Sequence, residues 1–200
     1  MKTGLLTSSD IKKLISDRKL TIVPLLESDQ IGGISVDLRI GIDFLSQHQG
    51  REPFIDTTND NITNRPIKSH FTETRRKLGE NFLLHPSQPV LFSTLEYIKL
   101  PNDVFVDLSL RSSYNRLGLN ISAIVQPGYC GCISVEVVNS GNTPIRIMSG
   151  ARFLQARFYK LHKSVDYFNI KRKYTCQVRP VASKANEDED LKKISSLFNF

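Results

Sequence analysis

A single carboxylate interrupts a run of strand-forming residues near the middle of the chain. Glu136 lies within Ile133-Ser-Val-Glu-Val-Val138, where alternation places it on one face with Cys132 and Ser134 and the apolar residues on the other. Burying a carboxylate costs free energy unless it is paired, and desolvation raises its pKa. Glu136 is our first candidate for a general base. The alternative is an ordinary glutamate on the outer face of a sheet.

Two arginines and two serines precede this strand. Arg111, Ser112, Ser113 and Arg116 lie close together in a turn-like segment. A guanidinium group presents a planar fork of donors and hydroxyls add short hydrogen bonds, so this set suits phosphate oxygens. A surface turn with ordinary charges is the alternative. An arginine near Glu136 would lower the carboxyl pKa that burial raises, and the two effects together can bring a general base into a useful range.

Several enzyme patterns are missing from the sequence. There is no G-x-x-x-x-G-K-[ST], no G-x-G-x-x-G, no H-E-x-x-H and no G-x-S-x-G. The zinc deaminase pattern, H-x-E with a later P-C-x-x-C, is missing too. We interpret Cys130 and Cys132, spaced C-x-C, as two buried apolar residues rather than a metal pair. Together with the distant Cys176 they fit a reducing compartment, not a disulfide framework.

Length and charge narrow the class of protein. Two hundred residues suffice for one domain with its own core. No apolar run could span a bilayer and the start does not resemble a signal peptide, so we expect a soluble cytoplasmic protein without a membrane partner. The net charge of +7 favours an anionic partner. Because the basic residues are scattered, with short clusters at 75–77 and 171–173, a phosphate-bearing small ligand is favoured over nucleic acid.

Most of the chain has the pattern of short strands between turn residues. Strand spacing or composition recurs at 35–40, 82–84, 90–93, 96–100, 104–110, 133–138, 145–148 and 153–159. Ser8-Ser9-Asp10 predicts the start of a short helix, and the polar stretch from Ser46 to about Gly79 predicts a long excursion with little regular structure. The pattern indicates a mainly β protein, a barrel or sandwich with minor helices.

The end of the chain differs in composition. An acidic run at 187–190 precedes apolar residues at helical spacing, Leu191, Ile194, Leu197 and Phe198. This predicts an amphipathic helix with an acidic first turn. We therefore expect a domain over residues 1–184 and a tail over 185–200, which would pack on its own domain, on a second subunit or on a protein partner.

Together these segments resemble the dCTP deaminase family of the trimeric dUTPase superfamily. The segment from Arg111 to Leu119 is similar to the family's R-S-S-x-x-R-L-G-L, Pro127-Gly-Tyr-x-Gly131 to its P-G-[FW]-x-G, and Ile133-Ser-Val-Glu136 with Asn139 to its I-T-L-E-x-x-N. Segments 35–39, 93–98 and 150–155 are also similar to family segments. Lys173-Tyr174-x-x-Gln177 resembles a carboxy-terminal lid that folds over the triphosphate. The resemblance covers roughly residues 5–184.

The resemblance implies a fold, an assembly and a reaction. The fold would be a distorted, jelly-roll-like β-barrel of the dUTPase type, assembled as a homotrimer with active sites between subunits. The reaction would be hydrolytic deamination of dCTP to dUTP and ammonia, without zinc, with magnesium bound through the triphosphate. Glu136 would activate water, while Ser112 and Arg116 hold the reacting groups in place. Further substrate contacts would come from Arg111, Ser113, Gln126, Tyr129, Val135, Gln155, Tyr167, Lys173, Tyr174 and Gln177.

Gln126 departs from the family pattern. The family usually has I-D-P-G where this chain has Val125-Gln126-Pro127-Gly128. In relatives that hydrolyse dUTP, the matching aspartate is the base that activates water for attack on phosphate, and an amide cannot accept a proton in that way. A bifunctional deaminase and diphosphatase is therefore disfavoured. The other alternative is a nucleotide-binding regulator or effector on the same fold, with weak or no catalysis.

Overall fold

The computed structural model describes residues 3–48, 54–57, 66–121, 123–169 and 172–198. Within these ranges most of the regular structure is strand. The strands are β1 (Gly4–Leu5), β2 (Thr21–Val23), β3 (Val36–Gln47), β4 (Phe71–Arg75), β5 (Asn81–Leu84), β6 (Val90–Lys99), β7 (Val104–Leu110), β8 (Leu119–Asn120), β9 (Ala123–Val125), β10 (Cys130–Asn139), β11 (Ile145–Met148) and β12 (Arg152–Lys160). The helices are α1 (Ser8–Ser16), α2 (Ser112–Asn115) and α3 (Glu189–Phe198), with short 3₁₀ turns η1 (Ser28–Gln30), η2 (Ile67–His70) and η3 (Ala185–Glu187).

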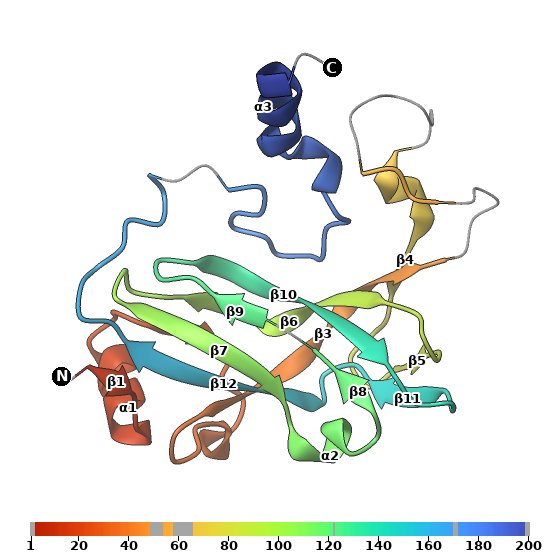
Figure 1. Cartoon of the computed structure of the whole chain (residues 1–200). Helices are drawn as coiled ribbons and strands as arrows, with labels where there is room; N and C mark the ends of the chain where they lie inside the picture. The colour runs from red at the N-terminus through yellow and green to blue at the C-terminus, as the bar shows by residue number, and fades with distance from the viewer. Residues whose placement is uncertain (1–2, 49–53, 58–65, 122, 170–171, 199–200) are drawn as a thin grey trace.

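One antiparallel sheet forms the body of the protein. Its strand order is β8-β10-β6-β3-β12-β7-β9, and β1, β2 and β4 pair with β12, β6 and β3 at its margins. The sheet curls until β9 and β10 lie side by side, which gives a distorted barrel (Figure 1). Strands β5 and β11 form a separate two-stranded ribbon. The predicted mainly β, jelly-roll-like barrel is confirmed.

The core consists of the inward faces of these strands. In β7, Val104, Val106, Leu108 and Leu110 are each at most 5% exposed, as the alternation predicts. Aromatic rings fill the interior: Phe92 and Phe153 meet edge to face with ring centroids 5.4 Å apart, and Phe44 stacks on Phe82 at 4.2 Å. Such close packing fixes the positions of the strands that carry the functional residues.

Two segments predicted as separate strands, 90–93 and 96–100, belong to one strand, β6. Its register against β10 shifts between the pairs Cys132–Tyr97 and Ser134–Ser93, which marks a bulge. At the bulge the Thr94 hydroxyl accepts from the backbone N–H of Ile133 at 2.9 Å and donates to the Glu96 carbonyl at 2.8 Å. The Thr94 side chain thus replaces a backbone hydrogen-bond partner within the sheet. The pattern of residue types does not reveal such a replacement.

The excursion predicted for Ser46 to Gly79 contains more regular structure than expected. Strand β3 continues to Gln47, and η2 and β4 follow within the same stretch; residues 49–53 and 58–65 lie outside the described ranges. Strand β4 pairs with β3 from Phe71 opposite Gln47 to Arg75 opposite Asp43. The prediction of little regular structure was wrong because pairing with a strong neighbouring strand compensated for the weak local pattern.

Both predicted terminal helices are present as backbone elements. Helix α1 begins at Ser8, and its N-cap is Thr7, one residue before the predicted Ser8-Ser9-Asp10 start; Thr7 forms a capping box with Asp10. In α3 the side chains of Ile194 and Leu197 are 49% and 76% exposed, whereas those of Leu191 and Phe198 lie outside the described set. Among the described helices, none is long and apolar enough to cross a bilayer.

Candidate active site

A pocket of about 680 Å³ lies between β10 and the segment that follows β12. We call residues 172–183 the lid segment; Figure 1 shows this part of the chain passing over β9 and β10. The wall combines strand ends, the turn before β10 and the lid segment, namely Gln47, Phe71, Pro89, Leu91, Ile124, Val125, Gln126, Tyr129, Ile133, Ser134, Glu136, Tyr167, Arg172, Lys173, Tyr174, Gln177, Val181 and Ser183.

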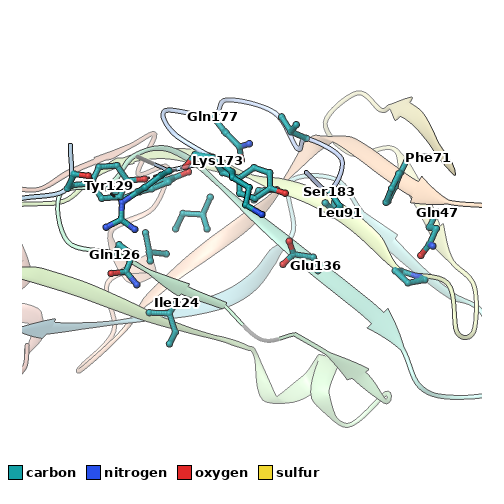
Figure 2. Close-up of a pocket in the computed structure, with 18 residues that line it drawn as sticks. Gln47, Phe71, Leu91, Ile124, Gln126, Tyr129, Glu136, Lys173, Gln177 and Ser183 are labelled. Atoms are coloured by element: carbon teal, nitrogen blue, oxygen red, sulfur yellow. Dashed lines mark hydrogen bonds between the residues drawn. The ribbon is translucent and has the colours of Figure 1, made fainter. Parts of the chain in front are cut away.

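Glu136 lies between the two ends of this pocket. In Figure 2 its carboxylate is flanked on one side by Gln126 and Tyr129 and on the other by Gln47 and Phe71. The strand alternates as predicted, with Val135 and Val137 fully buried and Glu136 turned outward. The carboxylate stays open to solvent in the single chain, yet partial desolvation by the pocket wall raises its pKa above the ordinary value.

Glu136 is the single carboxylate among the described residues that line the pocket, and two cations share the wall with it. Lys173 and Arg172 both come from the lid segment. The combination of a carboxylate of raised pKa with ammonium and guanidinium groups suits a ligand that is anionic at one end and reacts with water at the other.

Tyrosine rings form the end of the pocket nearest Gln126. The Tyr129 hydroxyl donates to the Cys132 carbonyl at 2.7 Å, and its ring meets Tyr167 edge to face at 6.2 Å. The Arg172 guanidinium lies over the Tyr167 ring at 4.4 Å. Burial raises the pKa of both tyrosines above the ordinary value of 10.0, at which a phenol is already neutral near pH 7.

The lid segment is attached to the start of β10. The Cys132 backbone N–H donates to the Gln177 carbonyl at 2.7 Å. Gly131 allows this approach, because a Cβ at that position would lie 2.4 Å from the same carbonyl oxygen and its φ is +140°. The Tyr174 hydroxyl, near the start of the segment, accepts from the N–H of Lys184, which follows its end, at 2.8 Å. These contacts position Lys173 and Gln177 over the pocket.

The arginine and serine group of α2 lies elsewhere in the single chain. Arg111, Ser112, Ser113 and Arg116 are absent from the described lining, and α2 lies on the opposite side of the strands from the lid segment (Figure 1). Helix α2 is held by Tyr114, whose ring packs on Phe153 with centroids 4.4 Å apart. These four residues therefore lie at α2 and not in the pocket that contains Glu136 of the same chain.

Val135 and Gln155 also lie outside the described lining. The side chain of Val135 is fully buried in the core, so only its backbone could contact a ligand. Gln155 lies in the middle of β12, paired with Ser109 and Asp37. The structure thus places Gln126, Tyr129, Glu136, Tyr167, Lys173, Tyr174 and Gln177 in one pocket and leaves the other predicted residues outside it.

Several pocket residues were not among the site residues predicted from the sequence. Gln47 and Phe71 lie within the predicted excursion and reach the pocket because β4 pairs with β3. Arg172 belongs to a basic cluster that the sequence does show, and Ile124 precedes the Pro-Gly turn. Proximity in the sequence could have identified these last two, whereas the first two depend on strand pairing.

The cysteines differ from the interpretation as buried apolar residues. Cys130 and Cys132 are only partly buried, Cys176 is exposed, and all three are free. The Sγ atoms of Cys130 and Cys176 lie 2.7 Å apart, although the residues are distant in sequence. The interpretation was wrong because the lid segment, rather than the core, covers this side of β10. Among the described residues no group of three or more His, Cys, Asp or Glu side chains could hold a metal ion.

Comparisons with known proteins agree with this arrangement. A family model described as dCTP deaminase-like matches residues 5–161. A protein of Dictyoglomus turgidum named "dCTP deaminase, dUMP-forming" is 37% identical over 191 residues, covering 92% of this chain and 96% of the relative. A "dCTP deaminase" of Halorubrum lacusprofundi is 34% identical, with 93% of each chain covered.

A solved structure supports the fold. The crystal structure of 2'-deoxycytidine 5'-triphosphate deaminase from Agrobacterium tumefaciens superimposes with a TM-score of 0.61 at 24% identity. The match covers 81% of this chain and 50% of that chain, so this protein corresponds to about half the length of the solved deaminase. The family model and the curated relatives, taken with the barrel and its pocket, show that the chain belongs to the dCTP deaminase-like family.

Proposed function

We propose that this protein hydrolyses the cytosine amino group of dCTP, forming dUTP and ammonia in nucleotide metabolism. The observation that carries the proposal is the position of Glu136, a carboxylate of raised pKa inside a pocket that also holds Arg172 and Lys173. The names of the curated relatives support the substrate. Three free cysteines fit the cytoplasm as the place of the reaction.

In the proposed mechanism Glu136 acts first as a base and then as an acid. Its carboxylate accepts a proton from water as the water oxygen bonds to C4 of cytosine. N3 of the ring takes up this proton. The remaining hydroxyl proton then passes through Glu136 to the amino group, the C4–N bond breaks as the C4=O double bond forms, and ammonia leaves. The lid segment would limit solvent access and so strengthen the interaction of Glu136 with the reacting groups. This mechanism needs no zinc.

We propose that α2 of a second subunit completes the site in a homotrimer. The support is that Ser112 and Arg116 are exposed on the single chain and lie away from its pocket. Arg116 of the neighbour would position the carboxylate and Ser112 the water, while Arg111 and Ser113 would contact phosphate oxygens.

Subunit mixing tests the shared site. Glu136→Gln and Arg116→Ala variants should each be inactive alone, because each lacks one part of the site. When they are unfolded together and refolded, mixed trimers should regain activity, since some sites combine Glu136 of one chain with Arg116 of another. Absence of any regained activity in verified mixed trimers would contradict a site between subunits.

Magnesium is proposed to bind through the triphosphate. Mg²⁺ is usually held by one or two carboxylates together with substrate phosphates. Because Glu136 is the only carboxylate in the described lining, most of the metal's ligands would be phosphate oxygens. The chain's own contribution would be Arg172 and Lys173, which neutralise phosphate oxygens from the lid segment. When bound, the metal would neutralise further phosphate charge.

A second product deserves a direct test. The Dictyoglomus turgidum relative and a 32% identical protein of Methanobrevibacter smithii are both named dUMP-forming. Those names favour further hydrolysis of dUTP to dUMP and pyrophosphate, whereas Gln126 lacks the basicity that this step would need.

The decisive experiment incubates the purified protein and magnesium with dCTP, CTP, dUTP and dCMP, and separates the products by chromatography. We expect dCTP to be converted to dUTP, with the Glu136→Gln variant at least about a hundredfold slower although it still binds dCTP. Glu80→Gln is the matched control, because Glu80 is exposed and absent from the described lining. An active Glu136→Gln protein would refute the mechanism, and dUMP as the main product would establish the second function.

A further inference from the structure

Two thiols lie together just outside the pocket. Cys130 begins β10 and Cys176 belongs to the lid segment, yet their Sγ atoms are 2.7 Å apart, and either thiol can donate to the other. Both are free, and Cys176 is exposed to solvent. A disulfide bond is about 2.05 Å long, so a small adjustment would suffice to form one. Neither side chain lines the pocket or has a part in the proposed mechanism.

The backbone holds this pair in position. Cys176 has a φ of +49°, a left-handed conformation that is uncommon outside glycine and costs free energy. The adjacent Gln177 carbonyl accepts from the Cys132 N–H at 2.7 Å, and Gly131 makes room for that contact. An unfavourable conformation therefore persists at the residue whose thiol faces Cys130.

We propose that Cys130 and Cys176 are a thiol–disulfide modification site, which a small disulfide of the glutathione type oxidises to an intrachain disulfide that fixes the lid segment on β10. Formation of the bond is independent of the proposed function. The effect of the disulfide on binding and release of dCTP rests on the proposed function. Lys173, Tyr174 and Gln177 line the pocket from the same segment.

The reaction is two successive thiol–disulfide exchanges. The Cys176 thiolate attacks the small disulfide, which forms a mixed disulfide and releases one small thiol. The Cys130 thiolate then attacks the Cys176 sulfur and releases the second small thiol. Both protein protons end on the released thiols, the two cysteines are oxidised, and the small disulfide is reduced. Partial burial raises the pKa of the Cys130 thiol, so its attack should accelerate as pH rises.

Cys132 provides a matched control. It lies on the same strand two residues from Cys130, and its backbone N–H donates to the Gln177 carbonyl of the lid segment. Cys132→Ser should therefore keep the reaction, whereas Cys130→Ser and Cys176→Ser should abolish it. Under reducing conditions Cys176→Ser should turn over dCTP at the normal rate, because Cys176 does not line the pocket.

The test treats the reduced full-length chain with oxidised glutathione. We expect the mass to fall by two hydrogens, peptide mapping to join Cys130 to Cys176, and hydrogen exchange of residues 172–183 to slow, all reversed by dithiothreitol. A stable glutathione adduct at Cys176, a bond between Cys130 and Cys132, no reaction, or unchanged exchange in the lid segment would each overturn the proposal.

A second measurement uses Glu136→Gln, which should bind dCTP without turning it over. Release of dCTP from its oxidised form should be roughly tenfold or more slower than from its reduced form, because covalent closure removes the opening of the lid segment. Equal release rates would overturn control of exchange by the disulfide. If dCTP does not bind even to the reduced form, the proposed function fails, while the mapped bond and the slowed hydrogen exchange still support the modification site.

Discussion

An oxygen of the Asp188 carboxylate lies 2.6 Å from Nζ of Lys173. Lys173 lines the pocket, whereas Asp188 belongs to the acidic start of the tail, between η3 and α3. The same ammonium group also donates to the Lys184 carbonyl at 3.3 Å. A tail carboxylate therefore occupies the position beside Lys173 that a phosphate oxygen would take in the proposed complex.

Asp188→Asn should strengthen substrate binding. Loss of the competing charge frees Lys173, and a partly exposed ion pair contributes at most about 1 kcal/mol, so the KM for dCTP should fall by roughly two- to fivefold with little change in kcat. Steady-state kinetics measure both. Asp190→Asn is the control. It removes the same charge from the tail, but Asp190 pairs with Lys193, at 3.9 Å, and not with Lys173. An equal effect of both variants would show that only net charge matters.

Asp37 should act on the reaction through Arg111. Its carboxylate lies 3.4 Å from Nε of Arg111 and 3.9 Å from Nη1 of Arg152, and its side chain is 14% exposed. In Asp37→Asn the guanidinium of Arg111 loses a charged partner, so we expect KM for dCTP to rise several-fold with a smaller change in kcat. Asp107→Asn, which breaks the pair with Arg157 in the same sheet, should leave KM unchanged. A loss of kcat alone would argue against a positioning role.

Gln126→Asp should add or increase the dUMP-forming step. A carboxylate at this position of the pocket wall can accept a proton from water, which the amide cannot do. Product chromatography with dUTP as substrate should then show dUMP and pyrophosphate. Gln126→Asn changes the length of the side chain without adding a base and should not produce them. If Gln126→Asp forms no more dUMP than the parent protein, another group limits that step.

The raised pKa of Glu136 should appear in the pH profile of kcat/KM. A general base works when ionised, so activity should fall as pH decreases through the pKa of Glu136 in the free enzyme. Because burial raises that pKa, the fall should be centred above the ordinary value of 4.5. Glu80→Gln should give the same profile. A midpoint at or below the ordinary value would assign the acidic limb to another group.

Glu96 should make stability depend on pH. Its fully buried carboxylate accepts from the Arg39 N–H at 2.9 Å and from Nε2 of Gln30 at 3.1 Å, but burial outweighs these contacts and raises its pKa from 4.5 to about 7. Between these values the folded state holds a proton that the unfolded state has released. Stability should therefore decrease as pH rises from 4.5 to 7 and then level off, by an amount on the order of 3 kcal/mol.

Denaturant unfolding at several pH values measures this dependence. Glu96→Gln should flatten the dependence of stability on pH. The variant should be less stable overall, because the NH₂ of the new amide would face a second donor, either the Arg39 N–H or Nε2 of Gln30. A Glu96→Gln protein with the same dependence on pH as the parent would show that other groups cause it.

The sequence determined the features that depend on neighbouring residues. Strand spacing or composition identified β3, β5, β6, β7, β10, β11 and β12, but not β1, β2, β4, β8 or β9. Alternation at a period of two also identified the buried face of β7 and the outward position of Glu136, because successive side chains of an extended chain point to opposite faces. The Arg-Ser-Ser and Pro-Gly segments were visible in the same way, as was the start of α1, although its N-cap is Thr7 and not one of the predicted residues.

Only the tertiary structure decided which distant segments meet. The bulge in β6, the arrival of Phe71 in the pocket, the separation of α2 from Glu136 and the contact between Cys130 and Cys176 all depend on register and on the path of the chain after β12. Residue types do not reveal these because pairing between strands far apart in sequence is selected by the packing of the whole barrel. Local pattern fixes which way a side chain faces, and only the packed fold fixes what it meets.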